Sequence, residues 1–132
     1  MAHDAQGGVG IVIVSHSRDV ARGTAEMALA MARGKARVAW CGGHADGKLG
    51  TVLADIRQRI DDVWSPRGVV VLVDLGGAEL NSETAIEMLD VDRRERVRLC
   101  TAPIVEGAIM AVAEASVGGD LASVQRAAED AV

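Results

Sequence analysis

Short, uninterrupted apolar runs alternate along this chain with segments that have the spacing of amphipathic helices. An apolar run of about four to eight residues without alternation is typical of a strand that is buried on both faces. Strands that alternate with helices form right-handed crossovers and therefore a mostly parallel sheet. The predicted fold class is α/β, a small doubly wound sheet of about four or five mostly parallel strands with helices on both faces.

The same pattern predicts where the elements lie. We expect strands at residues 9–14, 36–40, 68–73 and 97–100. The expected helices begin near Val20, Val52, Asn81 or Ser82, Ile104 and Leu121, and they end near Gly34, Val63, Leu89, Ser116 and Asp130. The expected inward positions are Val20, Thr24, Met27, Ala28 and Met31 in the first helix, and Ala85, Met88 and Leu89 in the third. Asp120 is the predicted N-cap of the last helix.

Composition and charge exclude several classes of protein. Apolar residues make up 49% of the 132 residues, but there is no Phe or Tyr and only two Trp. The core must therefore be aliphatic, and aromatic platforms that stack bases or sugars are nearly excluded. The net charge of −5 argues against a nucleic-acid-binding protein, which needs clustered Lys and Arg. The arginines between residues 93 and 98 alternate with acidic residues and predict a solvated face.

The length predicts one domain, with residues 1–8 as a flexible leader and residues 9–132 as the folded unit. The N-terminus lacks the charged and apolar regions of a signal peptide, and no apolar run approaches the ~20 residues of a membrane span. We therefore expect a cytoplasmic protein. In that reducing compartment Cys41 and Cys100 should be free thiols, and a disulfide between them is the less favoured alternative.

A histidine, His16, directly follows the first predicted strand, and Asp74 follows the third. If the strand order begins 2-1-3, as in flavodoxin-like sheets, these strands are neighbours, and ligands bind beyond their carboxyl ends. A carboxylate that holds one ring nitrogen leaves the other nitrogen free to attack an electrophile. Such a crevice beyond the strand ends suits a phosphoryl group carried on His16, with Asp74 orienting the imidazole. A structural histidine that caps the next helix is the alternative that stays open.

Serines and glycines near these turns are candidate supports for a phosphoryl group. They are Ser15, Ser17, Gly42, Gly43, Gly76 and Gly77. Glycine lets backbone N–H groups approach an anion closely, and helix N-termini add partial positive charge. The serines are interpreted as turn and phosphate-contact residues, because a serine nucleophile would need a G-x-S-x-G turn that the chain lacks. Direct nucleotide binding is weakly supported, since neither a Walker A nor a G-x-G-x-x-G motif is present.

No metal site is expected. His44 and Asp46 share the loop at residues 41–50, but two ligands do not make a metal site, and a solvated or gating loop residue is the favoured interpretation. His3 lies in the predicted leader.

Four segments in the expected order resemble the DhaM family, the phosphotransfer subunits of phosphoenolpyruvate-dependent dihydroxyacetone kinases. They are VGIVIVSHSRDVARGTAEMA from Val9, GGHADGKLGT from Gly42, VVVLVDLGGAELNSETAIEML from Val69 and PIVEGAIMAVAEAS from Pro103. The resemblance implies the fold of the mannose-class enzyme IIA of the phosphotransferase system. It also implies a phosphoenolpyruvate-glycerone phosphotransferase component that acts through a phosphohistidine.

The resemblance maps the family's active histidine onto His16 and its orienting aspartate onto Asp74. It implies that His16 accepts a phosphoryl group from phospho-HPr and passes it to ADP on the partner subunit DhaL, while DhaK binds dihydroxyacetone. No cofactor is then bound by this chain itself. Because the chain ends at Val132, separate HPr and enzyme I proteins are expected. A homodimer is also expected, although the last helices packing on their own sheet would explain the same apolar residues.

Two other functions stay open. One is a sugar-specific mannose-class enzyme IIA, but the resemblance favours the DhaM branch because Ala78 and Glu79 follow the glycine pair where sugar-specific enzymes carry a Gly-Gly-Ser-Pro type turn. The other is a non-catalytic flavodoxin-like binding module with a structural His16. If His16 is phosphorylated, the topology favours Nε2, the nitrogen that points away from Asp74.

Overall fold

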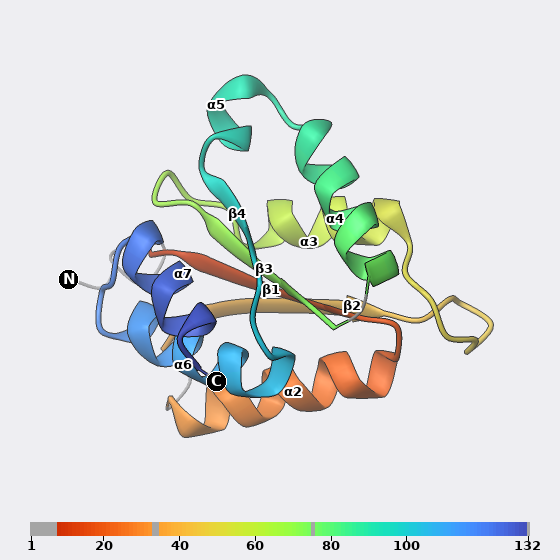
Figure 1. The fold of residues 1–132 in the computed structure, drawn as a ribbon, viewed down its shortest axis with the longest axis horizontal. Helices are drawn as coiled ribbons and strands as arrows, with labels where there is room; N and C mark the ends of the chain where they lie inside the picture. Colours follow the sequence, from red (N-terminus) through yellow and green to blue (C-terminus); the bar gives the residue numbers. More distant parts are fainter. Residues whose placement is uncertain (1–7, 33–34, 75, 132) are drawn as a thin grey trace.

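A sheet of four parallel strands in the order β2-β1-β3-β4 forms the centre of the protein (Figure 1). The computed structural model describes residues 8–32, 35–74 and 76–131. The strands are β1 (Gly10–Ser15), β2 (Arg37–Gly42), β3 (Val69–Val73) and β4 (Val97–Cys100). Each strand lies close to its predicted position, and the order begins 2-1-3 as expected. The predicted α/β class, with a parallel sheet, is confirmed.

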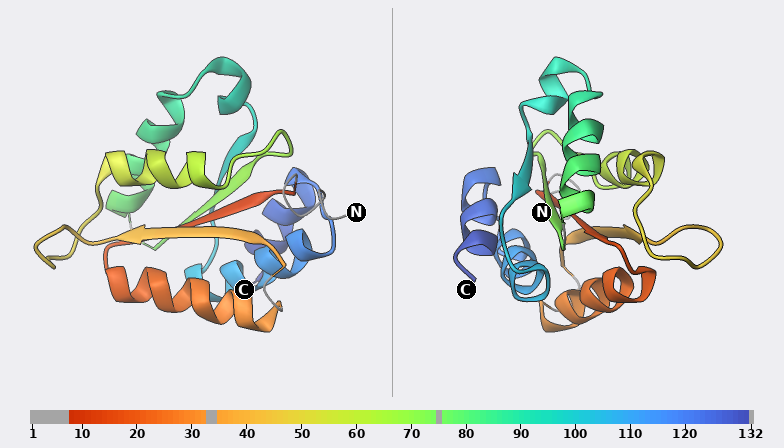
Figure 2. Two further views of the ribbon diagram at one scale, coloured as in Figure 1. Left: turned by 180° about the vertical axis from the view of Figure 1, so that it is seen from behind. Right: turned by 45° about the vertical axis from the view of Figure 1, so that its right-hand side comes forward.

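Helices cover both faces of the sheet (Figures 1 and 2). One face carries α3 (Leu53–Asp62) and α4 (Gly76–Glu87), and the short α5 (Val91–Arg94) follows α4 at the top of Figure 1. The other face carries α2 (Arg18–Met31), α6 (Ile104–Ser116) and α7 (Leu121–Glu129). The chain therefore leaves the neighbouring strands β1 and β3 toward opposite faces. This arrangement is the switch point at which doubly wound sheets open a crevice for ligands.

Alternate residues of the strands supply two hydrophobic cores. Ile11 and Ile13 of β1 pack with α2, α6 and α7, whereas Val12 and Val14 pack with α3 and α4. All four side chains are fully buried. This double burial explains why the strand sequences are continuously apolar rather than alternating.

The inward face of α2 was predicted wrongly. The buried residues are Ala21, Thr24, Ala25 and Ala28, of which only Thr24 and Ala28 were expected. Val20, Met27 and Met31 are 43%, 49% and 64% exposed. The physical reason is that α2 packs against α6 through small side chains on both helices, which include Ala108 and Ala111. The helix ends at Met31, and the predicted end at Gly34 lies outside the described residues.

The start of α4 was also predicted too late. The helix begins at Gly76, so Asn81 and Ser82, the expected caps, lie inside it, and Met88 is half exposed beyond its end. A glycine pair usually disfavours a helix, which is why the sequence indicated a turn there. The sequence pattern missed α5, which has four residues and buries none of them. The predicted cap Asp120 is confirmed, since its carboxylate accepts the N–H of Ser123 at 2.8 Å.

Both cysteines are buried free thiols, as expected. No helix among residues 8–32, 35–74 and 76–131 is long and apolar enough to cross a membrane.

Candidate functional site

The structure brings His16 and Asp74 together at the carboxyl edge of the sheet. His16 follows the last residue of β1 and Asp74 follows the last residue of β3, and these strands pair in register. The ring Nδ1 of His16 lies 3.0 Å from Oδ1 of Asp74. The side chains are 26% and 18% exposed, so the pair sits at an accessible rim. A carboxylate beside Nδ1 favours the tautomer with the proton on Nδ1, which leaves the lone pair of Nε2 available.

Residues 15–17 form the turn between β1 and α2, called the β1 turn, and this turn donates two hydrogen bonds to the second carboxylate oxygen of Asp74. The hydroxyl of Ser15 donates to Oδ2 at 2.7 Å, and the backbone N–H of His16 donates to the same oxygen at 3.0 Å. Ser15 is fully buried, and its oxygen also accepts the N–H of Ser17 at 3.0 Å. The hydroxyl of Ser15 is therefore occupied by Asp74 and Ser17. Ser17 itself is the N-cap of α2, where its hydroxyl accepts the N–H of Val20.

These hydrogen bonds keep Asp74 ionised. Partial burial on its own raises the pKa of the Asp74 carboxyl. The hydrogen bonds from the Ser15 hydroxyl, the His16 ring and the His16 backbone together outweigh that effect, and the resulting pKa lies below the ordinary value. The site thus pairs a carboxylate that stays charged with an imidazole whose orientation it fixes.

The other ring nitrogen of His16 lies against the start of α4. A Cβ placed on Gly77 would lie 3.1 Å from Nε2 and 3.6 Å from Cε1. A Cβ on Gly76 would meet nothing within 4 Å. The N-terminus of a helix presents free N–H groups and partial positive charge, which suit an anion. Gly77 is therefore the glycine that keeps space open beside Nε2.

Gly42, the last residue of β2, and Gly43, which follows it, lie on the other side of the β1 turn. A Cβ on Gly42 would collide with the backbone oxygens of Ser15 and Ser17, so the close packing of β2 against this turn requires glycine. The N–H of Gly43 donates to the carbonyl of Gly50 at 2.8 Å. That bond closes the base of the loop at residues 43–50. The sequence had grouped Gly42 and Gly43 with Gly76 and Gly77, whereas the structure separates the two pairs.

The sequence reasoning missed the residues that fasten this loop to the site. The N–H of Gly50 donates to the carbonyl of His16 at 2.9 Å. The amide of Asn81 on α4 donates to the hydroxyl of Thr51 at 2.6 Å. The only signal in the sequence is the density of glycine in this loop. Nothing local to Asn81 indicates that it contacts Thr51.

The loop histidine has a packing role in the structure. A Cβ on Gly50 would lie 2.3 Å from Nε2 of His44, so the ring rests against that glycine. The carboxylate of Asp46 accepts the N–H of Lys48 at 3.0 Å. Within the described part of the chain, no three or more His, Cys, Asp or Glu side chains are grouped to hold a metal ion. His3 lies outside the described residues.

Solved structures share this fold over nearly the whole chain. The crystal structure of a protein of unknown function has a TM-score of 0.82 and 33% identity, and the match covers 93% of this chain and 94% of that one. A sigma-54 interaction domain protein from Enterococcus faecalis has a TM-score of 0.71 at 15% identity, covering 94% and 90% of the two chains. The second likeness concerns the fold alone.

Sequence comparison places the chain in a family. Residues 10–125 match the family model EIIA-man, described as the PTS system fructose IIA component. A DhaM subunit of a PEP-dependent dihydroxyacetone kinase from Providencia stuartii is 35% identical over 94% of this chain, and one from Escherichia coli is 36% identical over 86%. The chain spans about a quarter of the length of these two relatives, 27% and 25%.

Another DhaM relative has a length similar to that of this chain, so the match covers most of both proteins. The phosphoryl donor subunit DhaM of a second PEP-dependent dihydroxyacetone kinase in Listeria innocua is 35% identical, and the match covers 83% of this chain and 87% of the relative. The motifs quoted from the sequence and the family model point to the same assignment. The chain belongs to the EIIA-man family and, within it, to the DhaM subunits.

Proposed function

We propose that this chain is the phosphoryl carrier of a PEP-dependent dihydroxyacetone kinase and that Nε2 of His16 carries the phosphoryl group. The observation that supports it best is the 3.0 Å contact between Nδ1 of His16 and Asp74, which leaves Nε2 free beside Gly77. The partial exposure of His16 allows a donor and an acceptor to reach the same nitrogen in turn.

The transfer needs few groups from this chain. The lone pair of Nε2 attacks the phosphorus of the phosphorylated donor, and the bond from phosphorus to the donor breaks with its electron pair leaving to the donor. The proton on Nδ1 stays in place, and the ionised Asp74 stabilises the positive charge that develops on the ring. The N-terminus of α4 provides partial positive charge for the phosphoryl oxygens. Transfer to the acceptor reverses these steps.

Ser15 and the glycines support this step in different ways. Ser15 orients Asp74 through its hydroxyl, and Gly77 leaves room for the phosphoryl group. Gly76 begins the helix whose N-terminus faces that group. Ser17, Gly42 and Gly43 hold the backbone of the turn and of the neighbouring loop.

The proposed partners rest on the resemblance to the DhaM family. We take phospho-HPr as the donor and ADP on a DhaL subunit as the acceptor, with dihydroxyacetone phosphorylated on a DhaK subunit. No cofactor is then bound by this chain. We further propose that residues 9–132 act as one domain, in the cytoplasm and as a homodimer.

Phosphorylation by the purified donor pathway tests the proposal. The protein is incubated with phosphoenolpyruvate, enzyme I and HPr, and its intact mass is followed for one acid-labile phosphoryl group. His16→Ala should take up none, whereas His44→Ala, which removes an exposed histidine in the neighbouring loop, should take up the same amount as the native chain. An unlabelled native chain, or a labelled His16→Ala variant, contradicts the proposal.

A second candidate function follows from the description of the matching family as a fructose IIA component. In that case a sugar-specific IIB protein would accept the phosphoryl group. Discharge of the labelled chain by DhaL with ADP supports the first function. Discharge by a IIB protein, with none by DhaL and ADP, supports the second.

A further inference from the structure

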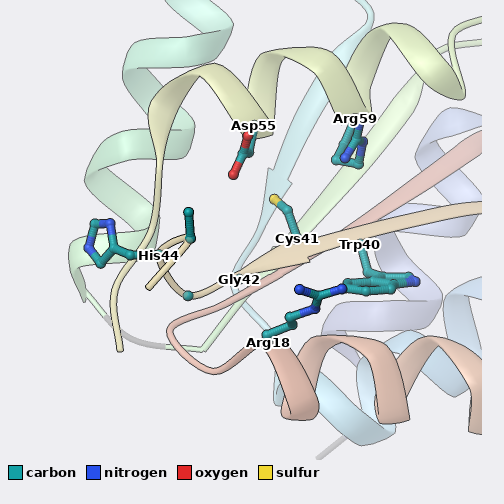
Figure 3. A pocket seen from close by; sticks show the side chains of 9 residues that line it. Arg18, Trp40, Cys41, Gly42, His44, Asp55 and Arg59 are labelled. Atoms are coloured by element: carbon teal, nitrogen blue, oxygen red, sulfur yellow. The ribbon is translucent and has the colours of Figure 1, made fainter. Parts of the chain in front are cut away.

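A pocket beside the His16 site is lined by side chains that have no part in the proposed phosphoryl transfer. Its volume is about 270 Å³, and it lies between the start of α2, the end of β2 and the first turns of α3 (Figure 3). The side chains that line it are Arg18, Trp40, Cys41, His44, Ala45, Asp55 and Arg59. Arg18 follows Ser17, so the pocket and the His16 site share one turn of the chain.

The pocket carries positive charge on an acidic protein. The whole chain has a net charge of −5, but the pocket has two arginines, Arg18 and Arg59, against one carboxylate, Asp55. The backbone of Gly42 and Gly43 also lines it. Two guanidinium groups at one small cavity favour a carboxylate or phosphate group, because each guanidinium can donate two parallel hydrogen bonds to such an anion.

Arg18 and Arg93 both lie over a tryptophan ring, but in the described part of the chain only Arg93 is also ion-paired. The guanidinium of Arg18 lies 5.9 Å from the centre of the Trp40 ring, and Arg93 stacks in the same manner on Trp64 at 4.6 Å. Arg93 also forms an ion pair with Asp61 at 2.9 Å. Within residues 8–32, 35–74 and 76–131, Arg18 has the ring contact but no ion pair. Its charge is therefore available at the pocket. Arg59 already forms an ion pair with Asp62 through its Nε at 2.7 Å, so a ligand would be met by the terminal nitrogens of its guanidinium.

The remaining walls indicate what the anion is attached to. Burial raises the pKa of the Cys41 thiol to about 12, and the nearby Asp55 adds to that shift, so the thiol that lines the α3 side of the pocket is uncharged. The ring of Trp40 supplies an apolar wall on the opposite, α2 side of β2. Asp55, on the α3 side, accepts hydrogen bonds but would repel a bare anion. These walls fit a short carbon chain that carries hydroxyl groups next to its charged group.

We propose that this pocket binds a small hydroxylated organic anion, either a phosphomonoester or a carboxylate, through Arg18 and Arg59, with Asp55 accepting a hydrogen bond from a hydroxyl group. The cavity is smaller than the ~300–1,000 Å³ typical of pockets for drug-sized molecules, so the ligand has a short carbon chain. The proposal goes beyond the phosphoryl-carrier function and does not depend on it.

Binding is measured by NMR titration of the isotope-labelled full chain with three compounds that share a three-carbon skeleton. These are glycerol 3-phosphate, glycerate and glycerol, and inorganic phosphate is a fourth probe. At least one of the two hydroxylated anions should shift the indole N–H of Trp40 and the amides of Gly42 and Gly43 in a saturable manner. Glycerol should shift none of them. The indole of Trp64 is the internal reference, because it lies under Arg93 and outside the pocket.

Matched variants separate this pocket from other anion sites. Arg18→Gln and Arg59→Gln should each weaken binding about tenfold, since each removes charge-assisted hydrogen bonds to the anion. Arg93→Gln removes the equivalent stacked arginine and should leave binding unchanged. His16→Ala should also bind as the native chain does, and Asp55→Asn should reduce the preference for glycerol 3-phosphate over inorganic phosphate.

The proposal is overturned if neither hydroxylated anion gives a saturable shift at millimolar concentration. It is also overturned if binding survives in both Arg18→Gln and Arg59→Gln, or is lost in His16→Ala. Inorganic phosphate binding as tightly as glycerol 3-phosphate, with no binding of glycerate, would contradict the organic ligand. Because the titration uses unphosphorylated protein, these outcomes are independent of the phosphorylation assay.

Discussion

The backbone N–H of Gly50 donates a hydrogen bond to the carbonyl oxygen of His16 at 2.9 Å. This bond joins the β2–α3 loop to the backbone of the histidine on which the proposed chemistry depends. Gly50 has a φ of +145°, a region that favours glycine, and the His44 ring occupies the space of its missing side chain. The loop and His16 are therefore linked through position 50, where only glycine fits.

Gly50→Ala should disturb the site from outside it. The added Cβ is strained at this φ and would lie 2.3 Å from the His44 ring, so we expect a loss of about 1–3 kcal/mol in the free energy of unfolding and slower phosphorylation of His16. Gly47→Ala is the control, because Gly47 also has a positive φ but nothing within 4 Å of its Cβ. Denaturant unfolding and the phosphorylation assay measure both effects. Equal rates for the two variants would contradict the link.

Gly77→Ala should separate stability from activity. Alanine in place of glycine in a helix adds up to about 1 kcal/mol of stability, so the fold should be retained. The new Cβ would lie 3.1 Å from Nε2 of His16 and occupy space that the phosphoryl group needs. We expect phosphorylation to slow about tenfold or more. Gly76→Ala, whose Cβ meets nothing, should keep the native rate, and a slow Gly76→Ala variant would mean that helix stiffness is the cause.

Asp74→Asn should keep the fold and slow the transfer by roughly two orders of magnitude. The amide retains the shape of the carboxylate but not the negative charge that stabilises the developing imidazolium. Rapid-quench measurement of the phosphorylated fraction gives the rate. Asp46→Asn, in the adjacent loop, is the matched control and should transfer at the native rate. A native rate in Asp74→Asn would remove Asp74 from the mechanism.

The same aspartate predicts a pH dependence of stability. The pKa of Asp74 is lowered in the folded protein, so its ionisation contributes stability that is fully present above the unfolded-state pKa of about 3.9. That contribution is lost as the pH falls through the lowered folded-state pKa. The difference in unfolding free energy between the native chain and Asp74→Asn should therefore be constant near neutral pH and shrink below about pH 4. A difference that does not change with pH would contradict the assigned shift.

Ser15→Ala should act through Asp74. It removes the hydroxyl that donates to Oδ2 of Asp74 and accepts from Ser17, so we expect a cost of about 1–3 kcal/mol and a rise in the pKa of Asp74. Carbon-13 NMR titration of the Asp74 carboxyl measures that rise. Ser116→Ala is the control, since its hydroxyl bonds to the carbonyl of Val112 away from the site and should leave the titration of Asp74 unchanged.

The sequence predicted those parts of the protein that depend on local pattern. Continuous apolar runs placed the strands, and the turn after each strand placed His16 and Asp74 at one edge. The wrong face of α2 has a tertiary cause, because the helix contacts α6 and buries Ala21, Ala25 and Ala28 in the core that the two helices share. The larger Val20 and Met27 stay outside. A prediction from hydrophobic periodicity depends mainly on bulky apolar side chains, so it does not detect a helix contact that is formed by alanines.

The candidate site shows the same limit. The pairing of His16 with Asp74 follows from strand order, but the role of Ser15 as their anchor depends on which way one buried hydroxyl points. Gly42 and Gly77 look alike in the sequence, yet one packs against the β1 turn and the other borders Nε2. The ring contact between Arg18 and Trp40 joins residues from two elements, and no sequence motif indicates it.

The hydrogen bond from Gly43 to Gly50 closes the base of the β2–α3 loop, so residues 44–49 form an excursion with fixed ends. Both ends of the excursion are fixed by backbone groups, and the tip projects from the body of the molecule (Figure 2). An exchange of these six positions between relatives would alter the outline of the protein beside the histidine, while the backbone bonds of Gly43 and Gly50 still hold the two ends of the loop. The surface that residues 44–49 present to a partner can therefore change in evolution independently of the His16–Asp74 pair.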